Sequence, residues 1–136
     1  MHRTTWRSVI RLTARSRQYA RRMDDCLFCR IVAGQVPADV VYATDRTLAF
    51  RDIAPQAPTH VLVVPREHYR DAAALAAAGE WLAGVLLADA AAVAAQEGLG
   101  ESGYRIVLNT GAGAGQTVFH VHAHVLGGRP LGWPPG

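Results

Sequence analysis

The chain has 136 residues, half of them hydrophobic, which suits one domain with a sizeable core. No apolar run approaches the roughly 20 residues of a membrane-spanning helix, so no membrane segment is predicted. The two cysteines, Cys26 and Cys29, are too few and too close together for a secreted disulfide framework. We therefore expect a reducing, cytoplasmic compartment.

The positive charge is confined to the start of the chain. All 14 basic residues are arginines, and seven of them lie before Met23, where there is no acidic residue. From Met23 onward, seven arginines face eleven carboxylates, a formal charge of −4. Recognition of nucleic acid needs a basic face on the folded part, so no nucleic-acid partner is predicted.

Residues 1–22 are predicted to be a basic, disordered extension, and residues 23–136 to be the folded domain. The extension lacks the apolar stretch of about 7–15 residues that a secretory signal requires. An organellar transit peptide is also rich in arginine and free of acids. An organellar location is therefore the alternative to a cytoplasmic one.

The folded part alternates between strand and helix patterns. A short helix is predicted over residues 26–33, ended by Gly34. Apolar and β-branched runs predict strands at residues 40–42, 48–51, 60–64, 104–109 and 118–126. Alanine-rich residues 71–97 predict a long helix, which Gly79 or Gly84 can interrupt. The pattern favours an α+β fold, an antiparallel sheet with helices on one face.

The most distinctive stretch is Phe119-His120-Val121-His122-Ala123-His124-Val125. In an extended chain this alternation places the three histidines on one face, about 6–7 Å apart. The four apolar residues take the other face and can pack on a core. Buried imidazoles each need a polar partner, so we interpret the histidine face as a site of catalysis or metal binding.

Residues 109–117, Asn-Thr-Gly-Ala-Gly-Ala-Gly-Gln-Thr, lead directly into this stretch. Small residues let a backbone approach a ligand closely, and successive amides can form an anion-binding nest. A mobile hairpin loop is the alternative for a glycine repeat by itself. Because three histidines follow, we expect a phosphate-binding loop.

These residues carry a resemblance to a known family. His-Val-His-Ala-His-Val-Leu resembles the signature of the histidine triad (HIT) superfamily. Residues 52–60, and residues 127–136 with their Trp-Pro-Pro-Gly ending, resemble the Hint branch, the histidine triad nucleotide-binding proteins. The resemblance implies a HIT-like α+β fold: a five-stranded antiparallel sheet with a long helix and a short N-terminal helix. It also implies that the sheet continues across a homodimer.

The resemblance implies that the middle histidine, His122, is the nucleophile. A neutral imidazole can attack phosphorus near pH 7. We expect a protonated His124 and the amides of residues 115–117 to donate hydrogen bonds to the phosphoryl oxygens. His60 resembles the family histidine that supports proton transfer behind the nucleophile.

A nucleotide-binding set is implied as well. The resemblance places Asp52 and Ile53 at the ribose and base, and a carboxylate can accept hydrogen bonds from both ribose hydroxyls. The full predicted set is Asp52, Ile53, Asn109, Gly115, Gln116, Thr117, His122, His124 and Trp133. Trp133 lies in the tail, which in the Hint branch reaches the active site of the partner subunit.

Cys26-x-x-Cys29 has the spacing of metal ligands. A tetrahedral zinc would need two more, and the resemblance implies His68 and His120. The alternative is a pair of reduced, packed cysteines with His68 exposed. Four protein ligands leave no open position, so the zinc would be structural and catalysis would need no cofactor.

The predicted enzyme is a nucleoside phosphoramidase. It would cleave the P–N bond of a nucleoside 5′-phosphoramidate through a nucleotidyl-histidine intermediate and release the nucleoside monophosphate, with purine nucleotides as expected ligands. One alternative is a dinucleoside polyphosphate hydrolase, as in the Fhit branch, against which the Trp-Pro-Pro-Gly ending argues. Others are a nucleotide- or partner-binding module with little turnover, and a metal protein that uses the triad as ligands.

Overall fold

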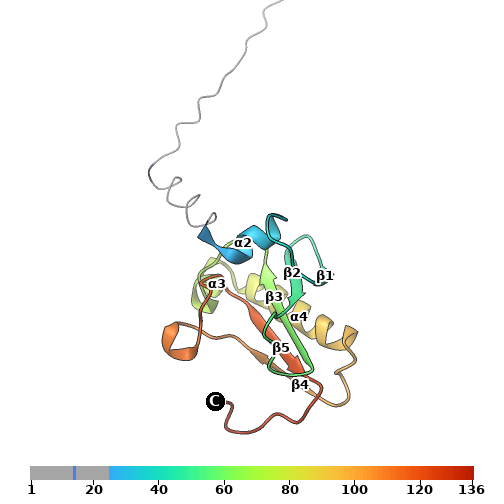
Figure 1. The fold of residues 1–136 in the computed structure, drawn as a ribbon. Coiled ribbons are helices and arrows are strands. Elements are labelled where there is room, and N and C mark those ends of the chain that lie inside the picture. The colour runs from blue at the N-terminus through green and yellow to red at the C-terminus, as the bar shows by residue number, and fades with distance from the viewer. Residues whose placement is uncertain (1–13, 15–24) are drawn as a thin grey trace, which may run out of the picture.

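The structure is a computed structural model that describes residue 14 and residues 25–136 (Figure 1). The expected basic extension, residues 1–22, lies outside the described residues except for Ala14. Among the described residues, no helix combines the length and apolarity needed to cross a bilayer.

Five antiparallel strands form one sheet in the order β1-β2-β3-β5-β4. The strands are β1 (Val40–Ala43), β2 (Thr47–Arg51), β3 (Thr59–Pro65), β4 (Tyr104–Val107) and β5 (Ala123–Gly127). The central strand β3 pairs with β2 on one side and with β5 on the other, so it brings the segment around Asp52 next to the histidine stretch. The predicted five-stranded antiparallel sheet is confirmed.

The helices are α2 (Leu27–Val32), α3 (Ala72–Ala78), α4 (Glu80–Gln96) and the short 3-10 helix η1 (Ala112–Ala114). The region predicted as one long helix is therefore two. Gly79 adopts an extended conformation, with φ 166° and ψ 128°, and separates α3 from α4. Gly84, the other possible break, lies within α4.

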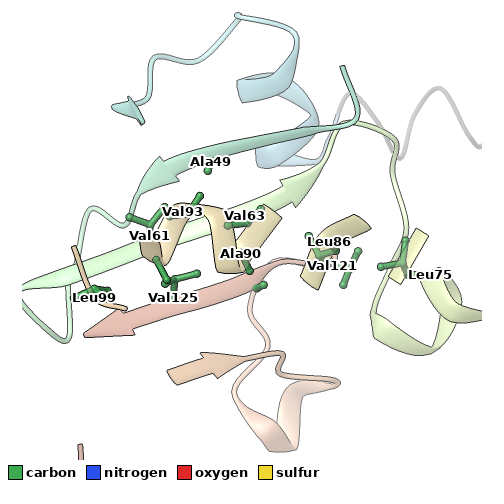
Figure 2. Packing of buried hydrophobic residues seen from close by; sticks show 12 residues of the cluster. Ala49, Val61, Val63, Leu75, Leu86, Ala90, Val93, Leu99, Val121 and Val125 are labelled. Carbon is green, nitrogen blue, oxygen red and sulfur yellow. The ribbon is translucent and has the colours of Figure 1, made fainter. Parts of the chain in front are cut away.

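Two apolar clusters lie on opposite faces of the sheet. The larger cluster packs Leu86, Ala90 and Val93 of α4 against alternate residues of the strands (Figure 2). On the other face, Phe28 of α2 packs against the intervening strand residues Leu48, Phe50, Leu62 and Val64. The expectation that the helices share one face is therefore wrong. Strands β2 and β3 are apolar on both faces, and each face needs a covering helix.

The histidine strand begins later than predicted, at Ala123 rather than at Val118. Val63 pairs with Ala123, so the same register would bring Pro65 opposite Val121. Pro65 has no N–H to donate, and the Val121 N–H donates instead to the Tyr69 carbonyl at 2.7 Å. His120 and His122 therefore lie in a non-strand segment that leads into β5. The other strand predicted too long, residues 104–109, ends at Val107.

Alternation nevertheless holds through this segment. Val121, Ala123 and Val125 belong to the cluster that contains α4, while the histidines between them point to the α2 side, where Phe28 contacts His120 and His122. Phe119 departs from the expected core position. It is exposed, and the guanidinium of Arg70 lies over its ring at 4.5 Å.

Two adjacent leucines of α4 test the packing. Leu86 is 2% exposed and Leu87 is 56% exposed. We expect Leu86→Ala to lower the free energy of unfolding by about 2–5 kcal/mol, because it leaves a cavity in the core. The matched change Leu87→Ala is expected to stay within about 0.5 kcal/mol of the parent. Urea denaturation measures both, and equal losses would contradict this packing.

Candidate functional site

A cleft of about 630 Å³ lies between α2 and the sheet. Five of the nine predicted nucleotide-binding residues line it: Asp52, Ile53, Thr117, His122 and His124. Four do not line it: Asn109, Gly115, Gln116 and Trp133. Residues far apart in the sequence thus meet in one cavity that is large enough for a small-molecule ligand.

One wall of the cleft is apolar and was not predicted from the sequence. Its residues come from α2, from the loop that follows it, and from β2 and β3: Leu27, Phe28, Ile31, Val36, Pro37, Phe50 and Leu62. The i, i+4 spacing of Leu27 and Ile31 puts them on one side of α2. This spacing is the feature of the sequence from which the wall could have been predicted. Such a wall suits the flat, apolar face of a ring.

His122 lies at the centre of the site and is only 8% exposed. Its Nδ1 is 2.7 Å from the backbone carbonyl oxygen of His120. A carbonyl can only accept, so Nδ1 donates and the lone pair of the neutral ring is on Nε2. Burial lowers the pKa of His122, which favours this neutral form at pH 7. The edge of Phe28 packs against the ring, with centroids 4.9 Å apart.

His124 lies between His122 and His60, with ring centroids 4.9 and 5.1 Å from theirs. Its Nδ1 is 2.8 Å from Nε2 of His60. Burial, and then the proximity of His122 and His60, lowers the pKa of His124 to about 4. The expected protonated His124 is therefore not the form that this environment favours. His60 contacts His124, while the Nδ1 of His122 is occupied by the His120 carbonyl.

The glycine loop is a tight turn rather than an open nest. Around η1, the amides of Gly115 and Gln116 donate to the carbonyls of Ala112 and Gly111, at 3.0 and 3.1 Å. These two expected phosphate donors are thus already used within the loop, and Thr117 is the member of the trio that faces the cleft.

Gln116 holds this loop in place. Its side chain is 3% exposed, its Oε1 accepts from the Gly111 amide at 2.8 Å, and its Nε2 donates to the Arg70 carbonyl at 2.9 Å. Both ends of the side chain amide are therefore engaged by the protein. In this structure Gln116 shapes the loop and does not line the cleft.

A cluster of potential metal ligands, the cysteine–histidine cluster, is formed by Cys26, Cys29, His68 and His120. All four potential ligand atoms lie within 4.8 Å of one another. The Nδ1 atom of His120 is 3.4 Å from Cys26 Sγ, 3.5 Å from Cys29 Sγ and 3.2 Å from His68 Nδ1. In a zinc tetrahedron with ordinary bond lengths, nitrogens lie about 3.3 Å apart and nitrogen and sulfur about 3.6 Å apart. The donor types and their spacing both fit zinc.

The protonation of His120 suits a metal ligand. Its Nε2 donates to the Pro65 carbonyl at 2.7 Å, which leaves the Nδ1 lone pair pointing at the cluster. Burial lowers the pKa of His120 to about 4, so the ring is neutral. Burial, with Cys26 beside it, raises the pKa of Cys29 to about 12. A bound cation would reverse that preference, because thiolates are the metal-binding form.

The chain belongs to the HIT domain family, whose model matches residues 33–131. It is 44% identical over 109 residues to the purine nucleoside phosphoramidase of Escherichia coli, which covers 80% of this chain and 92% of the relative. A HIT family hydrolase from Legionella pneumophila has the same fold, with a TM-score of 0.77 and 49% identity. That match covers 82% of this chain and 100% of the Legionella chain.

Two relatives are named for zinc. The 14 kDa zinc-binding protein of Zea mays is 48% identical over 122 residues, covering 85% of this chain and 93% of the relative. A Zn-bound histidine triad family protein from Mycobacterium smegmatis matches with a TM-score of 0.70 and 34% identity, covering 84% of this chain and 81% of that one. The matched fold therefore occurs with bound zinc.

Proposed function

We propose that this protein is a nucleotide hydrolase that cleaves the P–N bond of nucleoside 5′-phosphoramidates, with His122 as the nucleophile. The observation that carries the proposal is the 2.7 Å contact between His122 Nδ1 and the His120 carbonyl. Because of this contact, the neutral imidazole of His122 keeps its lone pair on Nε2. The His122 ring lines the cleft, where a substrate would bind. The similarity to the Escherichia coli phosphoramidase supports the substrate class.

The reaction has two displacements at phosphorus. In the first, Nε2 of His122 forms a bond to the α-phosphorus and the P–N bond breaks, while the departing amine takes up a proton from solvent. The imidazole then carries a positive charge, which the hydrogen bond from Nδ1 to the His120 carbonyl stabilises. In the second, water attacks phosphorus and loses a proton to solvent, the bond to His122 breaks and returns the neutral imidazole, and the nucleoside monophosphate is released.

The remaining residues bind and orient the nucleotide. In the proposed complex the base lies against the apolar wall with Ile53 at its edge, and the ribose hydroxyls bond to Asp52. The phosphate lies between Thr117 and His124, both of which line the cleft. We assign Asn109, Gly115 and Gln116 to the loop that holds Thr117 in position, and Gln116 has the contacts for that role.

We also propose that Cys26, Cys29, His68 and His120 hold a structural zinc. The fit of the four ligand atoms to a tetrahedron supports it, and a four-ligand site leaves no position for substrate. Neither cysteine is in a disulfide, so both are available as ligands, and the predicted cytoplasmic compartment would keep them reduced. Zinc would hold His120, and through it the carbonyl that faces His122.

A homodimer is proposed from the edge of the sheet. Strand β4 is an edge strand, and the nearby apolar side chains of Tyr104 and Leu108 are exposed. A second copy pairing with β4 would cover them and continue the sheet. Trp133 is 84% exposed, and Arg105 of β4 anchors the tail through a 2.8 Å bond to the Gly132 carbonyl. In such a dimer, Trp133 is the residue that would reach the partner's cleft.

The nucleophile is tested by His122→Ala. We expect hydrolysis of adenosine 5′-phosphoramidate to fall by about 10³-fold or more, because no covalent intermediate can form. Binding of AMP, measured by calorimetry, should be nearly unchanged. Mass spectrometry of the quenched wild-type reaction should reveal a nucleotidyl adduct on His122. Full activity in the variant would eliminate this role, and faster cleavage of diadenosine polyphosphates by the wild type would favour the alternative substrate.

Zinc is tested by elemental analysis of protein purified without chelators. About one zinc per chain is expected in the wild type, and none in Cys26→Ser, which lacks one of the four ligands. The neighbouring variant Asp25→Ala, outside the ligand set, should keep its metal. Metal-free wild type, or full occupancy in Cys26→Ser, would refute the site.

Trp133 is tested by mixing two variants. Trp133→Ala should lower phosphoramidate hydrolysis by about tenfold, because it loosens the leaving-group side of the site, and His122→Ala should be inactive. The two variants are then co-expressed as a heterodimer. Its His122→Ala chain supplies Trp133 to the intact His122 of the Trp133→Ala chain, so activity per intact site should return. In the matched control, the His122→Ala, Trp133→Ala double variant takes the place of the His122→Ala chain. Recovery in both mixtures, or in neither, would contradict a role across the interface.

A further inference from the structure

The loop before β3 fixes the protonation of His60. The backbone amide of Gln56 lies 3.0 Å from His60 Nδ1. An amide N–H can only donate, so the lone pair of the imidazole is on Nδ1 and the proton of the neutral ring is on Nε2.

The same hydrogen bond determines the tautomer of His124. Nε2–H of His60 has two acceptors within reach, His124 Nδ1 at 2.8 Å and Asp52 Oδ2 at 3.4 Å. Because the shorter contact is to His124, its Nδ1 is the acceptor and its own proton is on Nε2. His124 lines the cleft, so a neutral ring offers the cleft an N–H donor.

His60 cannot pick up a second proton without losing its bond to the Gln56 amide. The loop that supplies this amide is held by three further bonds. The Ala54 amide donates to Asp52 Oδ1, the Gln56 side chain donates to the Ala54 carbonyl, and Arg129 donates to the Gln56 carbonyl, at 2.8 to 2.9 Å. Burial also lowers the pKa of His60, although Asp52 opposes this. A residue that must stay singly protonated is unsuited to carrying a proton through a catalytic cycle.

The tautomer of His60 also disfavours a metal ion bound between Asp52, His60 and His124. Asp52, His60 and His124 have potential ligand atoms within 4.8 Å of one another. The atom that His60 would offer is Nε2, which carries its proton while the Gln56 amide bonds to Nδ1. A metal ligand needs a lone pair there, so the cluster works as a hydrogen-bond chain.

We propose that His60 is a positioning residue: it holds His124 as the Nε2–H tautomer, a permanent neutral donor toward the phosphoryl group, and does not shuttle the catalytic proton. This reverses the expectation that His60 supports proton transfer behind the nucleophile. The kinetic part of the proposal rests on the phosphoramidase function. The tautomer does not, and it can be measured without turnover.

Two substitutions of His60 by an amide side chain distinguish the role of Nδ1 from that of Nε2. In His60→Gln the side-chain NH₂ takes the place of Nε2 and can still donate to His124. In His60→Asn the shorter amide takes the place of Nδ1 and faces Gln56, so the donor to His124 is lost. Neither amide can carry a proton. We expect kcat for adenosine 5′-phosphoramidate to stay within about tenfold of wild type in His60→Gln and to fall by about 10²-fold in His60→Asn, with KM little changed, as for loss of a positioned donor.

A proton shuttle predicts a different result, because both variants would then lose about 10²–10⁴-fold. Equal losses, wild-type rates in both, or a loss confined to His60→Gln would each overturn the proposal. Thermal unfolding and AMP binding are measured on both variants to check that each is folded.

The tautomer itself is measured by ¹⁵N NMR of the wild type labelled at histidine. Near pH 7, His124 should carry its proton on Nε2, His60→Gln should keep that state, and His60→Asn should shift it. A proton on Nδ1 of His124 in the wild type would overturn the proposal whatever the kinetics. If the wild type does not hydrolyse phosphoramidates, the proposed function fails while the NMR measurement still decides the role of His60.

Discussion

One hydrogen bond, from Nδ1 of His122 to the carbonyl of His120, connects the cysteine–histidine cluster to the cleft. The side chain of His120 belongs to the cysteine–histidine cluster, and its main chain determines which nitrogen of His122 is free. The orientation of the central imidazole therefore depends on how firmly His120 is held. His120 is fully buried, and the Pro65 carbonyl accepts from its Nε2. In the proposed mechanism, the nucleophile is oriented by a residue that does not contact the substrate.

Main-chain groups perform most of this orientation. Carbonyls fix the protons of His120 and His122, and an amide fixes that of His60. Backbone groups do not titrate, so these contacts favour the same tautomers wherever the rings are neutral. The same groups could not be recognised by residue type, because any amino acid at position 56 except proline has the same N–H.

Much of the fold and part of the site could be predicted from the sequence. Alternation in the histidine stretch correctly separated the imidazoles from Val121, Ala123 and Val125, because period two follows from local backbone geometry. The start of β5 could not be predicted, because it depends on Pro65, which meets this segment only through the register with β3. The residues of the cleft wall were missed for a similar reason. Leu27, Ile31 and Leu62 are ordinary core residues by type, and only the placement of α2 on the second face of the sheet leaves them beside a cavity.

The glycine loop illustrates a different limit. Its composition indicates a backbone that can approach a ligand, but composition does not say which amides remain free. Gln116 was predicted to contact the nucleotide. In the structure its side chain instead stabilises the loop, through hydrogen bonds to Gly111 and Arg70. Its role depends on the tertiary position of residue 70, which has no local signature.

Helix α2 has one further consequence. It carries Cys29, its N-cap is Cys26, and its residues Leu27, Phe28 and Ile31 line the cleft. A six-residue helix is marginal in isolation and owes its order to what it packs against. A ligand bound to the cysteines would therefore stabilise the cleft wall through α2, and a ligand bound in the cleft would stabilise the cysteine pair. By thermodynamic reciprocity, the factor by which the proposed metal would tighten nucleotide binding equals the factor by which the nucleotide would tighten metal binding.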